Sequence, residues 1–592
     1  MSIFAGLTFS ADGSGSQAAR GRGGWRQRSR SGATAPEPKP PSKLALGHLL
    51  EWGDGMSSAR QVGFHMANEV DDQGENCHPM VRKLASIHDR GARDTHSAGK
   101  LMDLLIDHGL TAPIVDMDDP ASPATHMIPP SKLLDILHTR FSSRFETLLG
   151  IDEQKNLELW RRLRSSTDVF AKHAVLSRLT ENELKRVVPL TCHEDAAPFT
   201  KSLSVNLISF GGFFSRSGER IGKWPIVSYI QGVINKAQED ALWAPIIADF
   251  EFLATTGIGG WRFALVFAKG DLEVRANHWH LHHWNNDEPC TECSCNKGMV
   301  PYTDLRPSAL WRATTFPATT SGTDRVISRS TSASPHPLLA SSFRWRFLMP
   351  LDLMHVADCN GIMNHIAGSV LRPLVTGDLA FRLGGGTQAD RLRIINTNLS
   401  EFYDSRPGTA KLPGLRLANL VNSSGWACLS GQVVKAANTR GLAPWLVLIC
   451  DKYYNDDSDE YSRLVCRLCR FMDRFYCMLY AAGTLLTSAE VTAISKLLLR
   501  LGATYMALRD IAMSRSWYCW NVVMKVHYFQ HFADLVSAGL NPRWVQCYAE
   551  ESAVGVVAKA WGRSAHGRYR RTAQKVVLTK RLMSLYIRLE QQ

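Results

Sequence analysis

Cysteine and histidine side chains occur in this sequence at spacings that suit metal binding. In the stretch HHWNNDEPCTECSCNKG, Cys290 and Cys293 form a C-x-x-C pair and Cys295 follows two residues later. Two thiolates on one tight turn supply half of a tetrahedral zinc site. Far down the chain, in KVHYFQHFADL, His527 and His531 are four residues apart on a segment with a helical pattern. Both rings therefore project from one face, but neither pair completes a tetrahedron by itself.

Four carboxylates and a further histidine accompany these pairs. The run VPLTCHEDAAP places Asp195 directly after apolar residues, and FALVFAKGDLEV does the same for Asp271, where the end of a strand would hold each side chain. The stretch FLMPLDLMHVADCNG contains Asp352 and His355 with two residues between them, and Glu551 follows the histidine pair in YAEESAVG. The structural alternatives are helix capping by Asp352 and ordinary core or surface positions for the histidines.

Composition and periodicity separate the first half of the chain into three segments. Residues 1–43 are rich in Gly, Ser, Arg and Pro, and we expect a disordered basic tail. Residues 44–188 carry Leu, Ile and Phe at three- and four-residue spacing, which predicts a helical region. Short β-branched or aromatic runs broken by glycines and charged turns predict strands between residues 189 and 310.

The second half is mainly helical in pattern. Residues 311–342 are rich in Ser, Thr and Pro and predict an exposed loop. Amphipathic patterns such as SRLVCRLCRFMDRFYCMLYAAGTLL predict a helical section over residues 343–525, which contains the D-x-x-H motif. Residues 526–592 hold the histidine pair, Glu551 and a basic C-terminus. The run LAPWLVLIC within the helical section is short enough to be a buried strand.

The composition is that of a globular protein with a polyanionic partner. A hydrophobic share of 45% is typical of folded domains, and 592 residues are too many for one ordinary core. The net charge of +13 indicates nucleic acid or an anionic membrane. Thirteen scattered cysteines favour a reducing compartment over a disulfide framework. No uncharged apolar run approaches the ~18–20 residues that span a bilayer.

The order of the motifs resembles the catalytic core of eukaryotic cut-and-paste transposases. Those enzymes carry a DDE triad on an RNase H-like fold, with C-x-x-C after the second Asp and [C/D]-x-x-H before the Glu. The likeness is greatest to the CACTA and Kyakuja-Dileera-Zisupton transposases, in which segments like KGDLEV, PCxxC, LDLMHVADCNGIMNHIAG and KVHYFQH…YAEESAVG recur in this order. It covers roughly residues 189–592, about two thirds of the chain.

The resemblance implies an α/β fold, in which an RNase H-like core is interrupted by a large, mostly helical insertion and preceded by an α-helical N-terminal region. In such a core the first Asp lies on the central strand, the second just past another strand, and the Glu on a late helix. Asp195, Asp271 and Glu551 are therefore the expected catalytic residues and ligands of Mg²⁺ or Mn²⁺. Asp249 and Glu251 are rivals for the first acid.

Phosphodiester chemistry explains why three acids would be needed. Two divalent ions about 3.5–4 Å apart stabilise the nucleophile and the leaving group of an in-line displacement, and hard Mg²⁺ prefers carboxylate oxygens. Glu551 is preferred to Glu550 because it stands four residues before Gly555, as the Glu of the family does. We expect Asp352 and His355 at the entry to a helix close to these acids, with His355 orienting a phosphate or a neighbouring acid.

A structural zinc ion has a natural place in this arrangement. A Cys₂His₂ site of Cys290, Cys293, His527 and His531 would join the two ends of the insertion beside the carboxylates, with sulfur about 2.3 Å from the ion. Zinc would then be scaffold, and the chemistry would belong to the acids. The competing ligands, which are local in sequence, are His280, His282, His283 and Cys295.

We therefore expect a transposase, or a transposase-derived protein, that cleaves and joins DNA at the ends of a transposable element. The implied partners are transposon-end and target DNA and further copies of the chain, without a membrane, and the implied location is the nucleus. Basic C-terminal residues expected to neutralise phosphates are Arg563, Arg568, Arg570, Arg571 and Lys575. Two alternatives stay open: a domesticated or decayed copy that binds DNA or a partner without cutting, and a zinc-stabilised helical scaffold with incidental acids.

Overall fold

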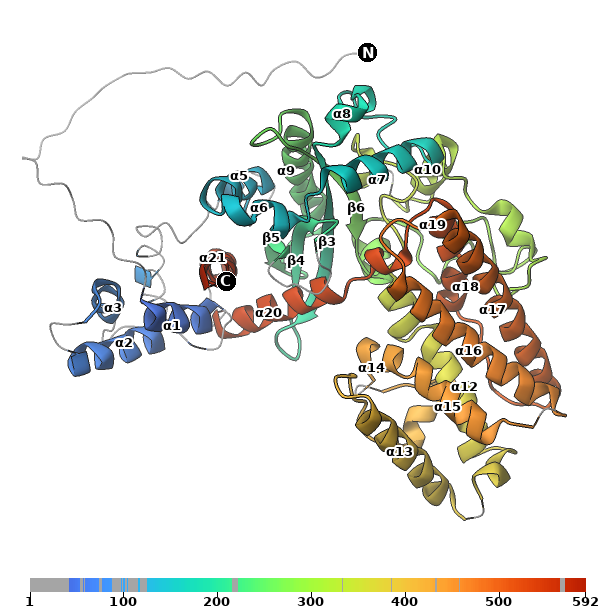
Figure 1. Cartoon of the computed structure of the whole chain (residues 1–592). Coiled ribbons are helices and arrows are strands. Elements are labelled where there is room, and N and C mark those ends of the chain that lie inside the picture. Colours follow the sequence, from blue (N-terminus) through green and yellow to red (C-terminus); the bar gives the residue numbers. More distant parts are fainter. Residues whose placement is uncertain are drawn as a thin grey trace, which may run out of the picture. The chain divides into compact units, whose positions relative to one another are not determined.

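The chain divides into two units, Met1–Pro41 and Ser42–Gln592, in the computed structural model (Figure 1). The structure describes residues 42–591 except 54–56, 58, 74–76, 88–96, 98–99, 102–103, 105–114, 118–124, 216–221, 333, 385, 432–433, 457 and 565–569. The basic tail predicted for residues 1–43 lies outside the described residues, apart from its last two.

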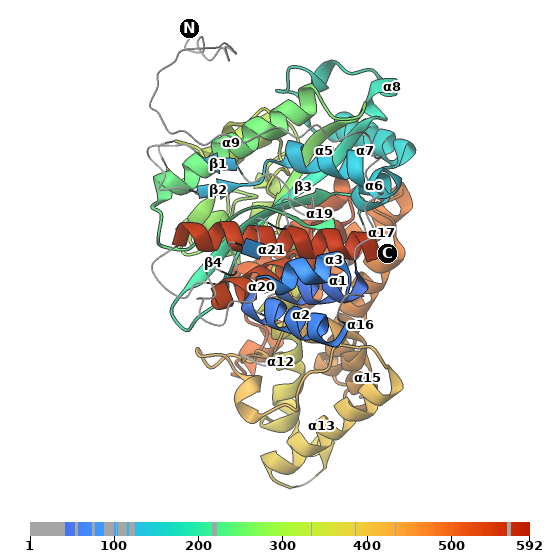
Figure 2. The ribbon, with the colours of Figure 1, turned by 90° about the vertical axis from the view of Figure 1, so that its left-hand side faces the viewer.

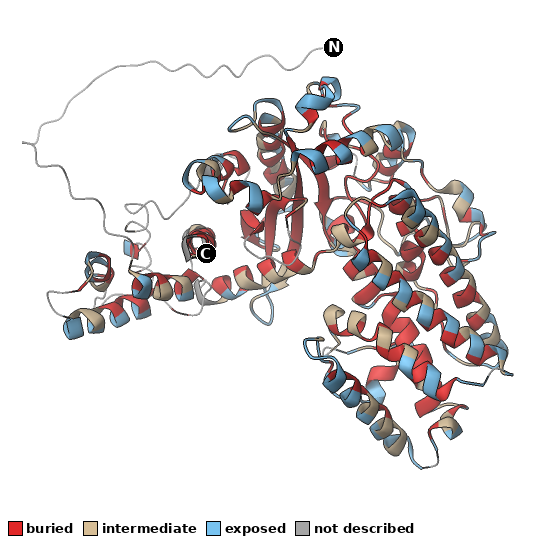
Figure 3. Ribbon diagram, viewed as in Figure 1, coloured by how far each residue is buried: buried red, intermediate tan, exposed pale blue. Residues whose placement is uncertain are grey.

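A four-stranded mixed sheet lies in the second unit. Its order is β5-β4-β3-β6, and the strands are β3 (Val187–Pro198), β4 (Ser204–Gly212), β5 (Trp224–Ile230) and β6 (Arg262–Lys269). Neighbours β3, β4 and β5 are antiparallel, whereas β6 is parallel to β3. The β-branched and aromatic runs of these strands are buried along almost their whole length (Figure 3), as expected for a sheet covered on both faces.

Helices cover the two faces of the sheet. On one face α9 (Lys236–Thr255) packs against the strands, and the rings of Phe210 and Phe250 meet edge to face at 6.2 Å. On the other face lie α20 (Tyr548–Ser564) and α21 (Arg570–Gln591), where Leu207 shares a core with Val554 and Trp561. Successive strand residues point to opposite faces, so neighbouring side chains of β3 reach different surroundings. The prediction of an α/β fold is confirmed.

The first helices pack against the last one. The side chains of Trp52 and Met66 share a small hydrophobic core with Met583 and Ile587 of α21. Figure 2 shows α21 crossing the sheet with α1 beside it. These front helices are α1 (Lys43–Gly53), α2 (Ala59–Gln73) and α3 (Pro79–Ala85). The helical prediction for this region holds for them, although a short hairpin, β1 (Val115–Met117) with β2 (Thr125–Met127), follows.

The helices that lead into β3 belong to the main core. They are α5 (Pro130–Arg140), α6 (Ser142–Leu149), α7 (Glu153–Ser166), η2 (Leu176–Arg178) and α8 (Glu181–Leu184). Helix α7 begins at Asp152, whose carboxylate accepts bonds from two backbone amides at 3.0 and 3.1 Å, which satisfies the free N–H groups of its first turn. Leu159, Trp160 and Leu163 of α7 are buried.

The segment predicted as an exposed loop over residues 311–342 is partly helical. It begins within η5 (Leu310–Thr314) and contains α10 (Thr320–Ser328) and α11 (Pro337–Ala340), while η4 (Val274–His278) precedes it. Thr323 is buried and donates a hydrogen bond of 2.7 Å to Asp168, and Val326 joins the main core. A few tertiary contacts thus hold a polar sequence that has little helical pattern of its own.

Most of the remaining chain is helical, as predicted. Its elements are η6 (Met354–Asp358), α12 (Ile362–Val375), η7 (Ala380–Leu383), α13 (Gln388–Ser405), η8 (Leu417–Leu420), α14 (Ala436–Gly441), α15 (Ala443–Tyr453), α16 (Glu460–Ala481), α17 (Ser488–Ser514), α18 (Met524–Gln530), α19 (Phe532–Ser537) and η9 (Pro542–Val545). The strand interpretation of LAPWLVLIC is wrong, because this run forms α15. By length and composition α17 is a candidate to cross a membrane, yet half of its apolar window is buried within the fold.

Candidate functional site

Three acidic side chains from distant parts of the chain interact at one end of the sheet. Asp195 lies near the end of β3, Asp271 follows β6, and Glu551 lies on the first turn of α20. Asp195 is buried, and Glu551 lies close enough for its charge to act on the Asp195 carboxyl group. Burial and the nearby charges of Glu551 and Asp271 raise the pKa of Asp195 well above its ordinary value.

Glu551 shows the same crowding of negative charge. Burial and the charges of Asp352 and Asp271 raise its pKa to about 7. Asp271 accepts a hydrogen bond of 2.7 Å from the backbone N–H of Val274. This bond holds one oxygen of the Asp271 carboxylate at the start of η4. The group therefore concentrates negative charge at this end of the sheet.

The neighbouring Glu550 has a different environment. Its carboxylate is buried and forms ion pairs with Lys269 and, at 2.8 Å, with Lys223. Although burial disfavours its charged form, the two ammonium groups hold the pKa of Glu550 below its usual range. Glu550 therefore ties α20 to the sheet, and Glu551 is the residue of this pair that faces the other acids.

The D-x-x-H motif lies beside the acids. The Asp352 carboxylate accepts hydrogen bonds of 3.1 Å from the backbone N–H groups of Met354 and His355, so it caps η6. It also pairs with Nδ1 of His355, while Nε2 of His355 lies 3.6 Å from Oε1 of Glu551. Burial opposes protonation of His355, but Asp352 and Asp271 raise its pKa. Capping and orientation of a neighbouring acid are thus combined in one motif.

A cavity of about 380 Å³ opens beside this group. Asp271 and His355 line it on one side, and Trp284, His365 and Lys525 are among its other lining residues. The ammonium group of Lys525 donates a hydrogen bond of 2.7 Å to the carbonyl oxygen of Cys359. Of the three acids Asp271 lines the cavity, which therefore leaves room for a ligand beside Asp271 and His355.

The two rival acids are bound elsewhere. Asp249 on α9 accepts hydrogen bonds of 2.6 and 2.7 Å from the hydroxyl and backbone N–H of Ser131. Glu251 lies 3.2 Å from Nε2 of His173 and also accepts a bond from Ser342. Both acids hold α9 to neighbouring segments, so Asp195 is the acid of the first strand that meets Asp271 and Glu551.

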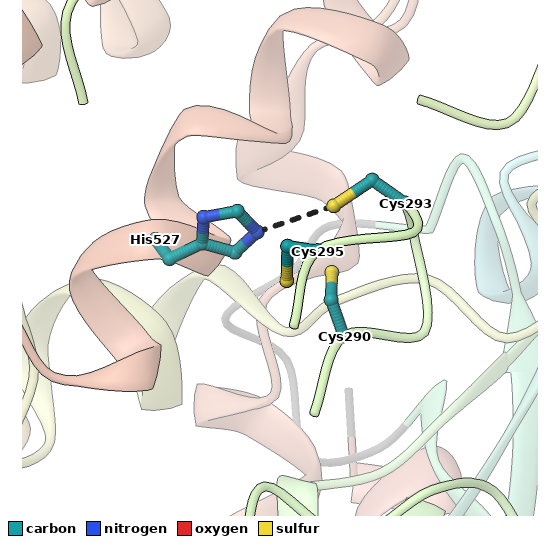
Figure 4. Close-up of side chains that lie close together, drawn as sticks. All are labelled: Cys290, Cys293, Cys295 and His527. Atoms are coloured by element: carbon teal, nitrogen blue, oxygen red, sulfur yellow. Dashed lines mark hydrogen bonds between the residues drawn. The ribbon is translucent and has the colours of Figure 1, made fainter. Parts of the chain in front are cut away.

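A second group of ligand atoms lies where the C-x-x-C loop meets α18. Donor atoms of Cys290, Cys293, Cys295 and His527 all lie within 4.8 Å of one another, and the four residues are buried (Figure 4). Sγ of Cys293 is 3.5 Å from Nε2 of His527, and Sγ of Cys290 is 3.5 Å from Nε2 of His531. The two Nε2 atoms are 3.2 Å apart. Soft sulfur and imidazole donors in this number suit Zn²⁺.

Both histidines are oriented through their other ring nitrogen. Nδ1 of His527 lies 3.1 Å from the carbonyl oxygen of Tyr302, and Nδ1 of His531 lies 2.8 Å from a carboxylate oxygen of Asp534. Such contacts fix the tautomer and aim Nε2 at a metal. The prediction that Cys290 and Cys293 meet the distant histidines therefore agrees with the geometry.

Of the competing ligands, Cys295 joins the group and the three local histidines do not. Nε2 of His280 lies 2.9 Å from Asp240, Nδ1 of His282 lies 3.0 Å from the carbonyl oxygen of Glu288, and His283 stacks on Trp284. The group of four close donors thus contains Cys295, which the sequence suggested as a competing ligand, in the place that the predicted Cys₂His₂ set assigned to His531. His531 is a fifth candidate through its contact with Cys290.

Sequence analysis missed the polar residues that hold these groups in place. Glu292, inside the C-x-x-C loop, is buried and pairs with Arg275 at 2.7 Å and with Arg346 at 2.6 Å. Asp358, three residues after His355, is buried and accepts hydrogen bonds from Tyr476 and, at 2.8 Å, from Tyr548. The signal for Asp358 is a charge inside an apolar pattern, which is too common to single it out.

The basic C-terminus is largely a packing element. Helix α21 is buried from Val576 to Ile587, and Nζ of Lys580 lies 5.0 Å above the ring of Trp52. Lys575, a predicted phosphate contact, is half-buried on this helix. The side chains of the other predicted contacts, Arg563, Arg568, Arg570 and Arg571, lie outside the described residues. The described part of α21 is buried between the front helices and the sheet, so most of its side chains are not exposed for contact with DNA.

Comparison of the sequence with protein-family models finds no match, and comparison with curated proteins finds none either. The functional argument therefore rests on the site itself.

Proposed function

We propose that this protein is a transposase, or derives from one, and that it cleaves and joins DNA strands with divalent cations held by Asp195, Asp271 and Glu551. The single observation that carries the proposal is the interaction of these three acids, which come from β3, the segment after β6, and α20. Their positions agree with the RNase H-like arrangement expected from the motifs, in which a strand, a strand end and a late helix supply the acids.

The acids fit divalent cations by charge as well as by donor type. Crowded carboxylates repel one another and hold protons at pH values where isolated acids have lost them. Mg²⁺ or Mn²⁺ would supply electrostatic stabilisation of the attacking and leaving oxygens. The protein would contribute the oxygen ligands, and His355 would hold the Glu551 carboxylate through a contact of 3.6 Å. The adjoining cavity of about 380 Å³ provides space for a substrate group beside Asp271.

Zinc would have a structural role in this protein. The loop of Cys290 and Cys293 follows Asp271, and the histidines on α18 and at its end precede Glu551. An ion bound by Cys290, Cys293, His527 and His531, with Cys295 as an alternative fourth ligand, would close the long segment between these two acids. It would hold the acid-bearing segments in register and take no part in the chemical step.

Metal-dependent nicking of supercoiled plasmid tests the proposal, since it needs no knowledge of the transposon ends. We expect Mn²⁺-dependent nicking by the wild type and at least a hundredfold loss in Asp195→Asn, Asp271→Asn and Glu551→Gln. Asp249→Asn is the matched control, because this acid lies on α9 and binds Ser131. Nicking that survives in all three site variants, or is lost equally in the control, would exclude the carboxylates as the catalytic group.

A further inference from the structure

Four arginines form a row on the exposed face of α16. Arg463, Arg467, Arg470 and Arg474 are all exposed, and their spacing of four, three and four residues places them on one side of a helix. At 1.5 Å per residue the row extends for about 16 Å. Acids also lie along this helix, with Glu460 three residues before Arg463 and Asp473 beside Arg474, so the row is a basic stripe with acidic neighbours. Asp451 pairs with Arg470 at 2.6 Å across exposed side chains, which is a weak contact in water.

The opposite face of α16 makes the row rigid. Val465, Leu468, Met472 and Phe475 are buried in the main core, and α16 packs against both α15 and α17. A helix fixed in this way presents its charges at constant spacing, unlike a mobile basic tail. The row is therefore a preformed surface.

The C-terminal end of this helix is bonded to the candidate site. Tyr476, two residues after the last arginine, donates a hydrogen bond to Asp358, and Tyr548 at the start of α20 donates to the same carboxylate at 2.8 Å. Asp358 stands three residues after His355, and Tyr548 three residues before Glu551. The row thus ends near the segments that carry the proposed catalytic residues.

Two more guanidinium groups lie at this end. Arg440 and Arg543 are positioned over the ring of Tyr480, with distances of 5.4 and 4.3 Å to its centroid, and Arg440 also lies 4.4 Å from the ring centroid of Tyr548. They continue the positive charge from α16 toward α20. A polyanion lying along the row would be led to the acids rather than away from them.

We infer that the arginine row of α16 binds the phosphate backbone of duplex DNA and guides it to the carboxylate site. The inference rests on the proposed function and names the surface that the substrate would follow. A length of about 16 Å matches roughly five phosphates of one strand, since successive phosphates are 3.4 Å apart along the duplex axis. Arginine suits this role because its planar group donates two parallel hydrogen bonds to phosphate.

Salt dependence of duplex binding tests the inference. The variant Arg463→Gln/Arg467→Gln/Arg470→Gln/Arg474→Gln is compared with the wild type on a 30-base-pair duplex of arbitrary sequence, without added divalent cation. We expect affinity to fall at least tenfold, and the slope of log K against log[salt] to shrink by up to about 3.6, because each lost phosphate contact removes about 0.9. The corresponding four-lysine variant keeps its charges and should retain most of the slope.

The matched control removes four exposed charges elsewhere, by Lys172→Gln/Arg178→Gln/Arg325→Gln/Arg393→Gln, and should leave most of the slope intact. Thermal unfolding of all variants checks that the fold is kept. A slope equal to that of the control, no duplex binding by the wild type, or a loss seen only on anionic lipid vesicles would overturn the inference. The same comparison is repeated with Asp271→Asn/Glu551→Gln added to the wild type and to every variant. Binding in that background is independent of the nicking result, so either proposal can fail without the other.

Discussion

The adjacent residues Glu550 and Glu551 have the same side chain but opposite electrostatic surroundings. Residues next to each other on a helix point about 100° apart, so Glu550 meets Lys223 and Lys269 while Glu551 meets Asp195 and His355. The first carboxylate has its charge compensated, and the second lies among like charges. Glu550 thereby stabilises the packing of α20 on the sheet, and Glu551 belongs to the proposed catalytic group.

Substitution of these two residues should have opposite effects on stability. Glu550→Gln leaves two buried ammonium groups uncompensated, and we expect the free energy of unfolding to fall by about 3–5 kcal/mol. Glu551→Gln relieves repulsion and should leave the urea midpoint unchanged or higher while nicking is lost. Urea denaturation of both variants beside the wild type measures the difference. Equal midpoints for the two variants would contradict this division of roles.

Asp358 should make stability depend on pH. Burial raises the pKa of Asp358 to about 7 in the folded protein, against 3.8 for the ordinary side chain. The folded state therefore keeps a proton that the unfolded chain has released, so this contribution is fully present below about pH 4 and is lost as pH rises through about 7. The difference amounts to at most about 4 kcal/mol. We expect Asp358→Asn to flatten the change in melting temperature between pH 5 and pH 8 relative to the wild type.

At the scale of elements, periodicity and motif spacing predicted part of what the structure shows. Helical sections, the strands that carry Asp195 and lead to Asp271, and the meeting of the two cysteines with the histidine pair follow from local pattern and donor chemistry. The nine-residue run that forms α15 was taken for a strand, because a short apolar run has no period that separates the two states. The sequence offered Cys295 only as a competing ligand and contained no sign of the ion pairs of Glu292. Both depend on how the loop closes in space, which no spacing in the sequence records.

Zinc analysis should identify the fourth ligand of the cysteine–histidine group. Cys290, Cys293 and His527 belong to both candidate sets, and Cys295 or His531 completes the tetrahedron. We expect His527→Ala and Cys293→Ala each to lose most of the bound zinc, measured by mass spectrometry of metals. Retention in Cys295→Ala with loss in His531→Ala would assign a Cys₂His₂ site, and the reverse would assign Cys₃His. Full retention in His527→Ala would exclude a zinc bridge to α18.

The two residues of the D-x-x-H motif have different roles: Asp352 caps η6, and His355 contacts Glu551. Because Asp352 makes the capping bonds and His355 makes the contact to Glu551, His355→Ala should lower nicking about 10–100-fold, a range typical of positioning contacts to metal ligands. His355→Gln should recover part of this loss if a hydrogen bond alone is needed. Unchanged nicking with a lower melting temperature would show that the motif has only a structural role.

At the scale of the whole second unit, helices near the end of the chain cover surfaces formed by segments near its beginning. The sheet strands precede residue 270, yet one of their faces is covered by α20 and α21. The front helices share their small core with α21. The long helical section between β6 and α20 must therefore bring the chain back to the sheet, and the cysteine–histidine group lies where that return is made.

Burial of α21 between the front helices and the sheet has a consequence for biosynthesis. The apolar faces of α1–α3 have no complete partner until α21 has left the ribosome. At roughly 5–20 residues per second the delay between the two is on the order of a minute. Through this interval the growing chain exposes both a helix-binding surface and one face of the sheet, so it would depend on chaperones. A chain truncated before α20 would lack Glu551. It would also lack α20 and α21, the two helices that cover one face of the sheet.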